Sequence, residues 1–484
     1  MRPKRRRRGS SAASCSRTFC DDSTIDPRYN GWWVDFLPCP VRYPRMHMTR
    51  AHPPCAHRPW RGPCAIALAA LAVAPLAHAQ LALPRVTLPA LPRLPSTNLP
   101  ERGLNVAPLQ SLRTNTIREL LRDHADVLEP DPSGEPIRRH ELLLVSPPRT
   151  TLDAALVQGF VLLREQSLPA LDLTQIVLLA PPGVGTAEAL ARLRAIDPAV
   201  EADFNHVYTR SGELAPAPDA TAAMASASTS RRVGLVDSGI DRRHASLRNA
   251  HVQAWGCDGN QMPSPHGTAI ASLLVGRDGA FSGAVPGVAL YAADIYCGQA
   301  AGGAVESLAL ALAWMAREKV AVINVSLVGP ANRVLQRAVT ALTERGHLIV
   351  AAVGNDGPAA PPLYPASYPG VVGVTGITPS RRVLPEAAQG PQVMFSAPGS
   401  ELAVARPGGG YVVARGSSFA APLVAGLLAE ALQVPDRLAA AAALARVAET
   451  AQDLGAPGRD PVYGVGLVAE HARIAPERVQ AAAR

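Results

Sequence analysis

The chain has 484 residues, and 48% of them are hydrophobic, which is enough to build a sizeable core and too much for a disordered polymer. The formal net charge is +8, but residues 1–79 hold 13 basic and 4 acidic side chains, so the 34 basic and 35 acidic residues of positions 80–484 nearly cancel. Nucleic-acid binding needs clustered positive charge beyond that first segment, so the charge distribution argues against it.

The first 79 residues have the features of an export signal. Arginines precede an apolar run, Cys64–Leu76, and Ala77-His78-Ala79 places small residues at the two positions that signal peptidase reads. We expect a signal peptide over 46–79, cleaved after Ala79, behind an upstream extension over 1–45, and a secreted or periplasmic product. A membrane crossing takes about 20 apolar residues, so we expect no stable membrane anchor.

Two different compositions follow. Residues 80–137 are rich in proline and leucine without steady periodicity, which favours a proline-rich linker or pro-region. From 138 to 209 short apolar runs alternate with helical patterns, which predicts a small α+β domain with helices over Thr151–Phe160 and Thr186–Ile196. Residues 210–230 are mostly alanine, serine, proline and threonine, which indicates an exposed linker and a candidate processing site.

A larger domain is expected over 231–475, before a short tail at 476–484. Its strand-like runs are apolar throughout, as in strands buried on both faces, and helical segments lie between them. The predicted strands are Val233–Val236, Val320–Val325, His347–Val353 and Val371–Ile377, and the predicted helices include Val305–Lys319 and Asn332–Arg345. The alternation predicts an α/β fold with a mainly parallel sheet covered on both sides.

Four polar residues lie where such a fold places its ligand crevice, at strand ends and helix starts. Asp237 ends a strand, His266 opens a helical stretch, Asn355 follows a strand and Ser418 begins a helix. Each has an ordinary structural explanation when it is taken alone, as a turn former or a helix cap. Together they form an ordered set in which every member has its own glycine-containing motif.

These motifs resemble those of the subtilisin-like serine peptidases, the subtilases. The resemblance covers about 231–475 and rests on Asp237-Ser238-Gly239, His266-Gly267-Thr268, Gly354-Asn355 and Gly416-Ser417-Ser418-Phe419-Ala420-Ala421-Pro422, with Asn324-Val325-Ser326-Leu327, Ser396-Ala397-Pro398-Gly399 and Tyr463-Gly464-Val465-Gly466-Leu467-Val468. It implies a subtilisin-like three-layer fold behind a propeptide-like α+β domain, and a serine endopeptidase that acts on polypeptides. The Asp, His, Ser order is that of subtilisin.

The resemblance also implies a role for each residue. Ser418 would be the nucleophile and His266 the base that takes its proton, because a serine hydroxyl reacts poorly near neutral pH without one. Asp237 would orient the imidazole and stabilise its charged form. The Asn355 amide, with the Ser418 backbone N–H, would stabilise the oxyanion, and no cofactor is expected.

Substrate peptides are expected to pair as an added strand with Ser326, Leu327, Val328 and Gly329. Val328 replaces a glycine usual in the family and would crowd the cleft. Leu363, where relatives often carry glycine, would make the first specificity pocket shallow and favour small side chains.

Cysteine and carboxylate usage bears on disulfides and metals. Only Cys257 and Cys297 remain after the predicted signal peptide, and an exported pair favours a disulfide over two buried thiols. The stretch 276–286 offers one carboxylate, Asp278, far short of the six to eight oxygens that calcium takes, so we expect no metal.

The position of the 138–209 domain suggests an inhibitory propeptide that keeps the enzyme latent until the following linker is cut. A plain accessory domain is the alternative. From another class of function, an inactive subtilase fold acting as an extracellular binding module is possible if Val328 and Leu363 block the cleft. A nucleotide-binding protein has only Gly408–Gly410 in its favour, without the spaced glycine fingerprint that follows a first strand.

Overall fold

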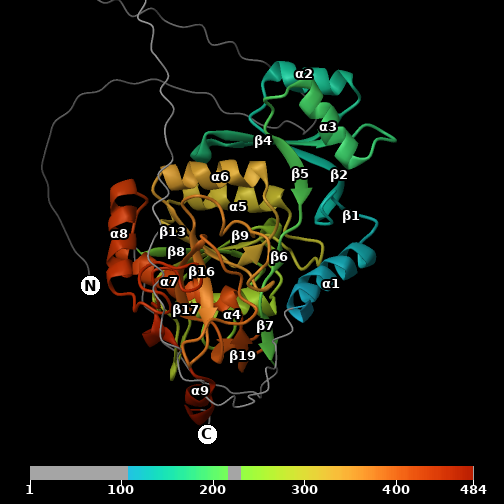
Figure 1. The fold of residues 1–484 in the computed structure, drawn as a ribbon. Coiled ribbons are helices and arrows are strands. Elements are labelled where there is room, and N and C mark those ends of the chain that lie inside the picture. The colour runs from blue at the N-terminus through green and yellow to red at the C-terminus, as the bar shows by residue number, and fades with distance from the viewer. Residues whose placement is uncertain (1–106, 216–230, 483–484) are drawn as a thin grey trace, which may run out of the picture. The chain divides into compact units, whose positions relative to one another are not determined.

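The computed structural model describes residues 107–215 and 231–482 (Figure 1). The predicted extension, the signal peptide and residues 80–106 and 216–230 of the two predicted linkers lie outside the described residues. The chain divides into two units, Met1–Thr97 and Asn98–Arg484, and all the described residues belong to the second. Within the described ranges, no helix is both long and apolar enough to span a bilayer.

A seven-stranded sheet forms the centre of the larger domain. Its order is β17-β16-β15-β13-β8-β12-β9, and all the pairings are parallel. The strands are β8 (Arg232–Asp237), β9 (Val252–Trp255), β12 (Ala289–Asp294), β13 (Val322–Val325), β15 (Leu348–Ala352), β16 (Val372–Ile377) and β17 (Val393–Pro398). The α/β prediction with a mainly parallel sheet is therefore confirmed.

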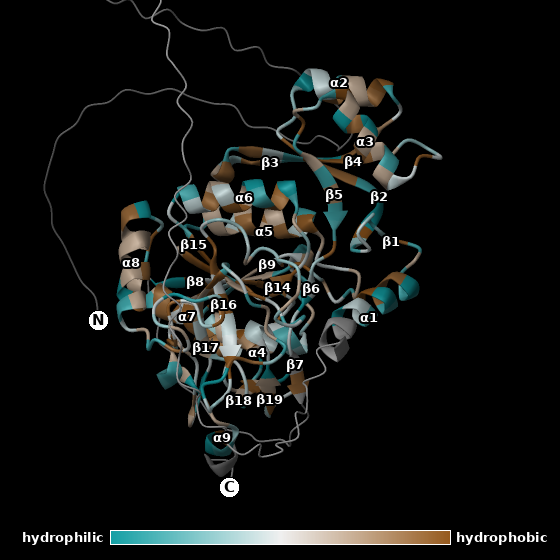
Figure 2. Ribbon diagram, viewed as in Figure 1, coloured by the Kyte–Doolittle hydropathy of each residue, from teal (hydrophilic) through white to brown (hydrophobic). Residues whose placement is uncertain are grey.

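Helices cover both faces of this sheet, because alternate residues of each strand point to opposite sides. In β13, Val322 packs on the side of α4 (Pro265–Val275) and α7 (Ser417–Ala431), whereas Ile323 packs on the side of α5 (Val305–Arg317) and α6 (Arg333–Glu344). Hydrophilic and hydrophobic residues alternate along α6 in Figure 2, as expected of a helix with one buried face. This is a three-layer arrangement.

A smaller antiparallel sheet precedes the large domain, in the order β1-β2-β4-β3 with β5 paired to β2. The strands are β1 (Leu128–Pro130), β2 (Pro136–Val145), β3 (Val161–Leu168), β4 (Leu173–Leu179) and β5 (Ala202–His206), and the helices are α2 (Arg149–Val157) and α3 (Thr186–Ile196). One face packs on α2 and α3, and the other joins the core around α5 and α6 through Leu143, Val145 and Val177. The predicted α+β unit before the large domain is confirmed.

Part of the predicted first linker differs from expectation, because residues 107–123 form α1 (Ala107–Asp123) and β1 lies in the same segment. Ile117, Leu120 and Leu121 are spaced as on one helix face; Ile117 is buried, and the two leucines pack against a small cluster around Leu128. Composition alone concealed this short amphipathic signal.

The second predicted linker and the tail also contain regular structure. Thr209–Arg210 (β6) and Glu213–Ala215 (β7) are strands, which pair with β14 (Leu327–Val328) and β19 (Tyr411–Arg415). β19 also pairs with β18 (Leu402–Ala405), and a two-residue hairpin joins β10 (Arg277–Asp278) to β11 (Phe281–Ser282). The tail forms α9 (Pro476–Ala482), whose Val479 enters the core, and α8 (Arg437–Glu449) precedes it.

Candidate active site

Asp237 and His266 meet at the carboxyl edge of the sheet. Asp237 is the last residue of β8 and is fully buried, and His266 is the second residue of α4. His266 Nδ1 lies 2.9 Å from Asp237 Oδ2 and 3.0 Å from Oδ1. The carboxylate also accepts hydrogen bonds from the backbone N–H and the hydroxyl of Ser238. A carboxylate bound to Nδ1 fixes the ring orientation and directs Nε2 into the cleft.

Ser418 lies in the first turn of α7 and is fully buried. The chain turns from β19 into the helix at Gly416, whose φ of 139° favours glycine. A side chain there would also lie 2.8 Å from Gly212 Cα and 3.0 Å from Asn355 Nδ2. This glycine therefore lets the serine turn approach both the cleft segment and the asparagine.

Asn355 is held beside Ser418 by its own side chain. Its Oδ1 accepts a hydrogen bond from Ser417 N at 2.9 Å, and Ser417 Oγ accepts one from Gly354 N at 3.2 Å. The Asn355 Nδ2 group is buried and has no hydrogen-bond partner among the described residues. An unpaired buried donor costs free energy, so this amide is poised for an acceptor that enters the cleft.

The protein's own chain occupies the cleft. β6 pairs antiparallel with β14, and β7 pairs with β19, so the chain crosses the site in an extended form. Between them, the carbonyl oxygen of Ser211 contacts Ser418 Oγ and lies 3.1 Å from His266 Nε2. Ser418 and His266 thus converge on one oxygen, although no direct hydrogen bond between them occurs in the described part of the chain.

The predicted substrate-binding residues line this path. Ser326 Oγ donates to the Ser418 carbonyl at 2.9 Å, and Leu327 and Val328 pair with Arg210 and Thr209. A side chain at Gly329 would lie 2.6 Å from the Tyr208 ring, so the glycine permits that ring to approach. Val328 therefore does not exclude an added strand.

Leu363 is buried and lies near the cleft. A Cβ atom at Gly354 would be 2.5 Å from Leu363 Cδ1 and 3.7 Å from Val328 Cγ1, so this leucine fills the space behind the Gly354-Asn355 turn. Leu363 does not line the cavity that adjoins Ser211, which is described below.

Comparison with known proteins agrees with this geometry. The family model described as the subtilase family matches residues 229–466. Subtilisin Savinase from Lederbergia lenta is 31% identical over 241 residues, which are 49% of this chain and 88% of that protein. The chain belongs to the subtilase family. Its membership makes it a subtilisin-like serine peptidase by descent.

Two further similarities are more distant. The minor extracellular protease Epr of Bacillus subtilis is 28% identical over 241 residues, 49% of this chain, and the match spans 37% of Epr. The crystal structure of fervidolysin from Fervidobacterium pennivorans, a keratinolytic enzyme related to subtilisin, aligns with a TM-score of 0.57 at 20% identity. It covers 71% of this chain and 61% of fervidolysin, so the likeness in fold extends beyond residues 229–466.

A cavity of about 310 Å³ adjoins Ser211 in the subtilase cleft. It is lined by Arg113 and Thr116 of α1, by Thr209, Arg210, Ser211 and Gly212, and by Val328, Asn355, Asp356, Glu386, Arg415 and Gly416. Both the large domain and the preceding segment therefore build its wall. No pattern within residues 107–123 indicated that α1 reaches this site.

Arg113 of α1 pairs with charged groups both in the segment before the large domain and in the large domain itself. Arg113 donates two hydrogen bonds to Glu135, at 2.7 and 2.6 Å, and its Nε lies 3.5 Å from Asp356 Oδ2. Burial raises the pKa of Asp356 to about 6, because desolvation outweighs the attraction of Arg113, and Glu135 adds to the rise. The cavity thus holds a carboxyl group that titrates in mildly acidic solution.

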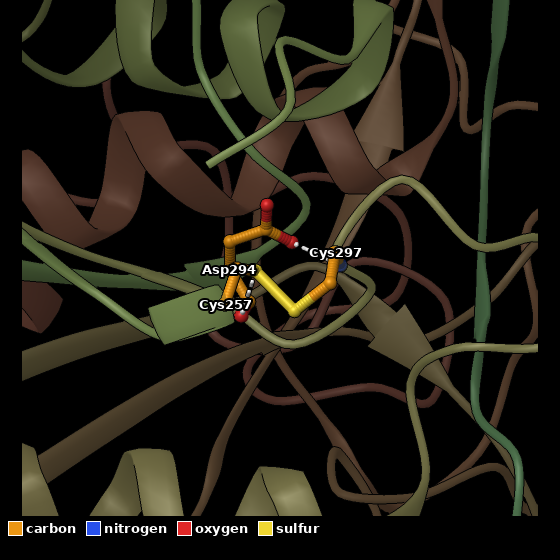
Figure 3. A group of neighbouring side chains, drawn as sticks. All are labelled: Cys257, Asp294 and Cys297. Carbon is orange, nitrogen blue, oxygen red and sulfur yellow. Dashed lines mark hydrogen bonds between the residues drawn. A yellow bond between two sulfur atoms is a disulfide. The ribbon is translucent and has the colours of Figure 1, made fainter. Parts of the chain in front are cut away.

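Cys257 and Cys297 form a disulfide with an S–S distance of 2.19 Å, and Asp294 lies beside them (Figure 3). Asp294 Oδ1 accepts hydrogen bonds from the backbone N–H groups of Tyr296 and Cys297, both at 3.0 Å. The cysteine and carboxylate atoms lie within 4.8 Å of one another, as in a metal site. Bonded sulfurs, however, are not the thiolates that bind metals.

Asp278, the one carboxylate of the stretch 276–286, is hydrogen-bonded within the protein. Asp278 Oδ2 accepts a hydrogen bond from the Tyr411 hydroxyl at 2.9 Å.

The residues that sequence reasoning missed are those of the cleft segment and its contacts: Tyr208, Arg210, Ser211, Ser264 and Tyr296. Ser211-Gly212, two small residues just after the predicted α+β domain and before an alanine-rich tract, was the available signal. This signal was too weak to single out these two residues within the predicted linker.

Proposed function

We propose that the protein is a secreted serine endopeptidase made as a latent precursor, with Ser418 as nucleophile, His266 as general base and acid, and Asp237 as the residue that orients the histidine. One observation carries the proposal. An extended segment of the chain is paired on both sides of Ser211, and the Ser211 carbonyl contacts both Ser418 Oγ and His266 Nε2. A peptide substrate would have to lie in the same way.

The reaction proposed first is cleavage of the Ser211–Gly212 bond. Ser418 Oγ forms a bond to the Ser211 carbonyl carbon as His266 Nε2 takes its proton, and the negative charge moves to the carbonyl oxygen. The bond to the Gly212 nitrogen then breaks, and His266 gives the proton to that amine. Water hydrolyses the resulting ester by the same steps.

The oxyanion would be stabilised by Asn355 Nδ2 and the Ser418 backbone N–H. In the uncut chain the Ser211 oxygen contacts the nucleophile and the base, and Asn355 Nδ2 has no partner among the described residues. The carbonyl oxygen would therefore turn toward Asn355 Nδ2 as the bond is cut, while the flanking residues stay paired with β14 and β19.

Contacts beyond the cleft support an inhibitory role for the preceding α+β domain. Arg164 donates to Glu306 Oε2 at 2.6 Å, at the start of α5, and Asn332 Nδ2 donates to the Phe204 carbonyl at 2.9 Å. The first bond joins β3 to α5, and the second joins β5 to the start of α6, so both fasten the α+β domain to the large domain. Before the cut this domain would act as an intramolecular inhibitor, and after the cut it would be a separate chain held in the cleft only by noncovalent contacts.

Export of the mature enzyme is part of the proposal. The predicted signal over 46–79 supports it, and the relative Epr is an extracellular protease by name. Polypeptides are the proposed substrates.

The inactive binding module is the competing function, and labelling with a serine-directed fluorophosphonate distinguishes the two. We expect the processed protein to be labelled and the Ser418→Ala variant to remain an unlabelled precursor. Absence of labelling in a processed, folded protein would favour the binding module. Normal processing of Ser418→Ala would show that another protease makes the cut.

A further inference from the structure

The cleft segment shows how each side chain before the proposed cut is received. With Ser211 at the residue before the cut (P1), Arg210 is at P2 and Tyr208 at P4. The Tyr208 backbone N–H donates to the Gly303 carbonyl at 2.9 Å, and its carbonyl accepts from the Tyr296 hydroxyl at 2.7 Å. Pairing of β6 with β14 holds the other edge.

Tyr208 fixes the register of this strand. Its side chain is fully buried, and its hydroxyl donates to the Pro330 carbonyl. The close approach over Gly329 leaves no room for a side chain there. A buried aromatic side chain contributes a large part of the free energy of binding, so Tyr208 acts as an anchor that sets where Arg210 lies.

Arg210 meets a receiving surface at P2. Its guanidinium lies 4.7 Å from the centre of the Tyr296 ring, within the range of a cation–π interaction. Its Nη1 donates to Ser264 Oγ at 2.9 Å. Tyr296 thus contacts the cleft segment twice, through its ring at Arg210 and through its hydroxyl at the Tyr208 carbonyl.

The electrostatic surroundings also favour a cation. The pKa of the Tyr296 hydroxyl is raised, mainly by burial. The positive charge of Arg210 lowers this pKa, and the carboxylates of Asp237 and Asp294 raise it further. One oxygen of Asp294, Oδ2, is buried without a hydrogen-bond partner among the described residues. Burial raises the pKa of Asp294 itself, and in its charged form this carboxylate, like that of Asp237, attracts a guanidinium bound at Tyr296.

The two loops that form this surface are joined covalently. Cys257 precedes Ser264 in one loop, Cys297 follows Tyr296 in the other, and their disulfide ties the loops together (Figure 3). A pre-formed surface binds its ligand with less loss of conformational freedom.

We infer that the mature enzyme selects peptide substrates with arginine at P2, which the Tyr296 ring and the Ser264 hydroxyl recognise. The inference rests on the proposed function, because it treats the protein's own uncut segment as a substrate. It names a substrate class: polypeptides that carry arginine one residue before a small P1 residue.

The test uses processed enzyme and four fluorogenic peptides of the form Tyr-Thr-X-Ser, with X as arginine, lysine, norleucine or glutamate. Norleucine keeps the length of the aliphatic stem and removes the charge. We expect kcat/KM to fall in that order, with arginine about three- to fivefold better than norleucine, because Arg210 is partly exposed to solvent. Equal or better cleavage of the norleucine peptide would overturn the inference.

Matched variants assign the preference to particular residues. Tyr296→Leu removes the ring and should reduce the arginine-to-norleucine ratio about threefold or more, whereas Tyr296→Phe keeps the ring and should retain most of that ratio. Because a buried tyrosine is sensitive to replacement, Ser264→Ala provides a second variant that should also lower the ratio. An unchanged ratio in both Tyr296→Leu and Ser264→Ala would contradict the assignment.

Active-site titration with a fluorophosphonate precedes each measurement and separates two kinds of failure. An enzyme that titrates fully but shows no preference for arginine overturns the inference and leaves the proposed function intact. A processed protein that does not titrate overturns the proposed function, and the inference with it.

Discussion

Replacing Gly212 with alanine should slow self-cleavage of the precursor. Gly212 follows the proposed scissile carbonyl, and its φ of 117° is one that residues with a side chain rarely adopt. An added Cβ would lie 2.7 Å from Phe419 Cε2 and 3.3 Å from the Arg415 carbonyl oxygen. Both the backbone and the added methyl group therefore oppose the position the segment now takes.

The size of the effect follows from these two terms. A residue forced into such a backbone conformation costs about 1–3 kcal/mol, and every 1.4 kcal/mol changes a population about tenfold. The contact with Phe419 adds to this unless the ring shifts. We therefore expect the first-order rate of precursor processing, followed by gel electrophoresis and intact mass, to fall about ten- to hundredfold.

Gly183→Ala is the matched control. Gly183 also has a positive φ, 77°, but an added Cβ there has no atom within 4 Å, and it lies in the loop before α3. This variant should be destabilised by the same kind of backbone strain and still be processed at nearly the normal rate. If Gly212→Ala matures as fast as the unmodified chain and has the same new N-terminus, the proposed position of Gly212 in the cleft is wrong.

Three further predictions concern the site and its surroundings. Asn355→Ala should lower kcat by about 10²–10³ in peptide hydrolysis with little change in folding, because it removes one oxyanion donor; a loss under threefold would exclude that role. Replacing Cys257 and Cys297 together with serine should lower the free energy of unfolding by about 2–4 kcal/mol in denaturant titrations, and an unchanged midpoint would refute this. The pKa of Asp356 is raised to about 6, so between pH about 4 and 6 the folded precursor keeps the Asp356 proton that the unfolded chain has released. The contribution of this group to the free energy of unfolding is therefore complete below pH about 4 and is lost as the pH rises through 6. In a precursor that cannot cleave itself, Asp356→Asn should remove about 2–3 kcal/mol of that pH dependence between pH 4 and 7, and identical curves for the two proteins would contradict the assignment.

Much of the large domain was predictable because its signals are local. Runs such as residues 348–353 are apolar throughout, which is typical of a strand buried on both faces. The helix over 186–196 was predicted with the same bounds that the structure gives α3. The glycine-containing motifs around Asp237, His266, Asn355 and Ser418 indicated which strand ends and helix starts meet.

Other features depend on contacts between distant segments, which no local pattern encodes. The helix α1 was hidden by its proline-rich neighbours, and only its packing against residues such as Leu128 and Val207 explains it. Residues 210–215 looked like the start of a linker because the strands in this segment exist only by pairing with the cleft. The meeting of Arg210 with Tyr296, 86 positions apart in the numbering, has no sequence signal at all.

Mass spectrometry of the exported protein and of its Ser418→Ala variant reports both the bond that is cut and the residue that cuts it. We expect a mature chain that begins at Gly212 in the unmodified protein and an unbroken Ser211–Gly212 bond in the variant. A variant cut at that same bond, or an active enzyme in which the bond stays intact, would contradict it.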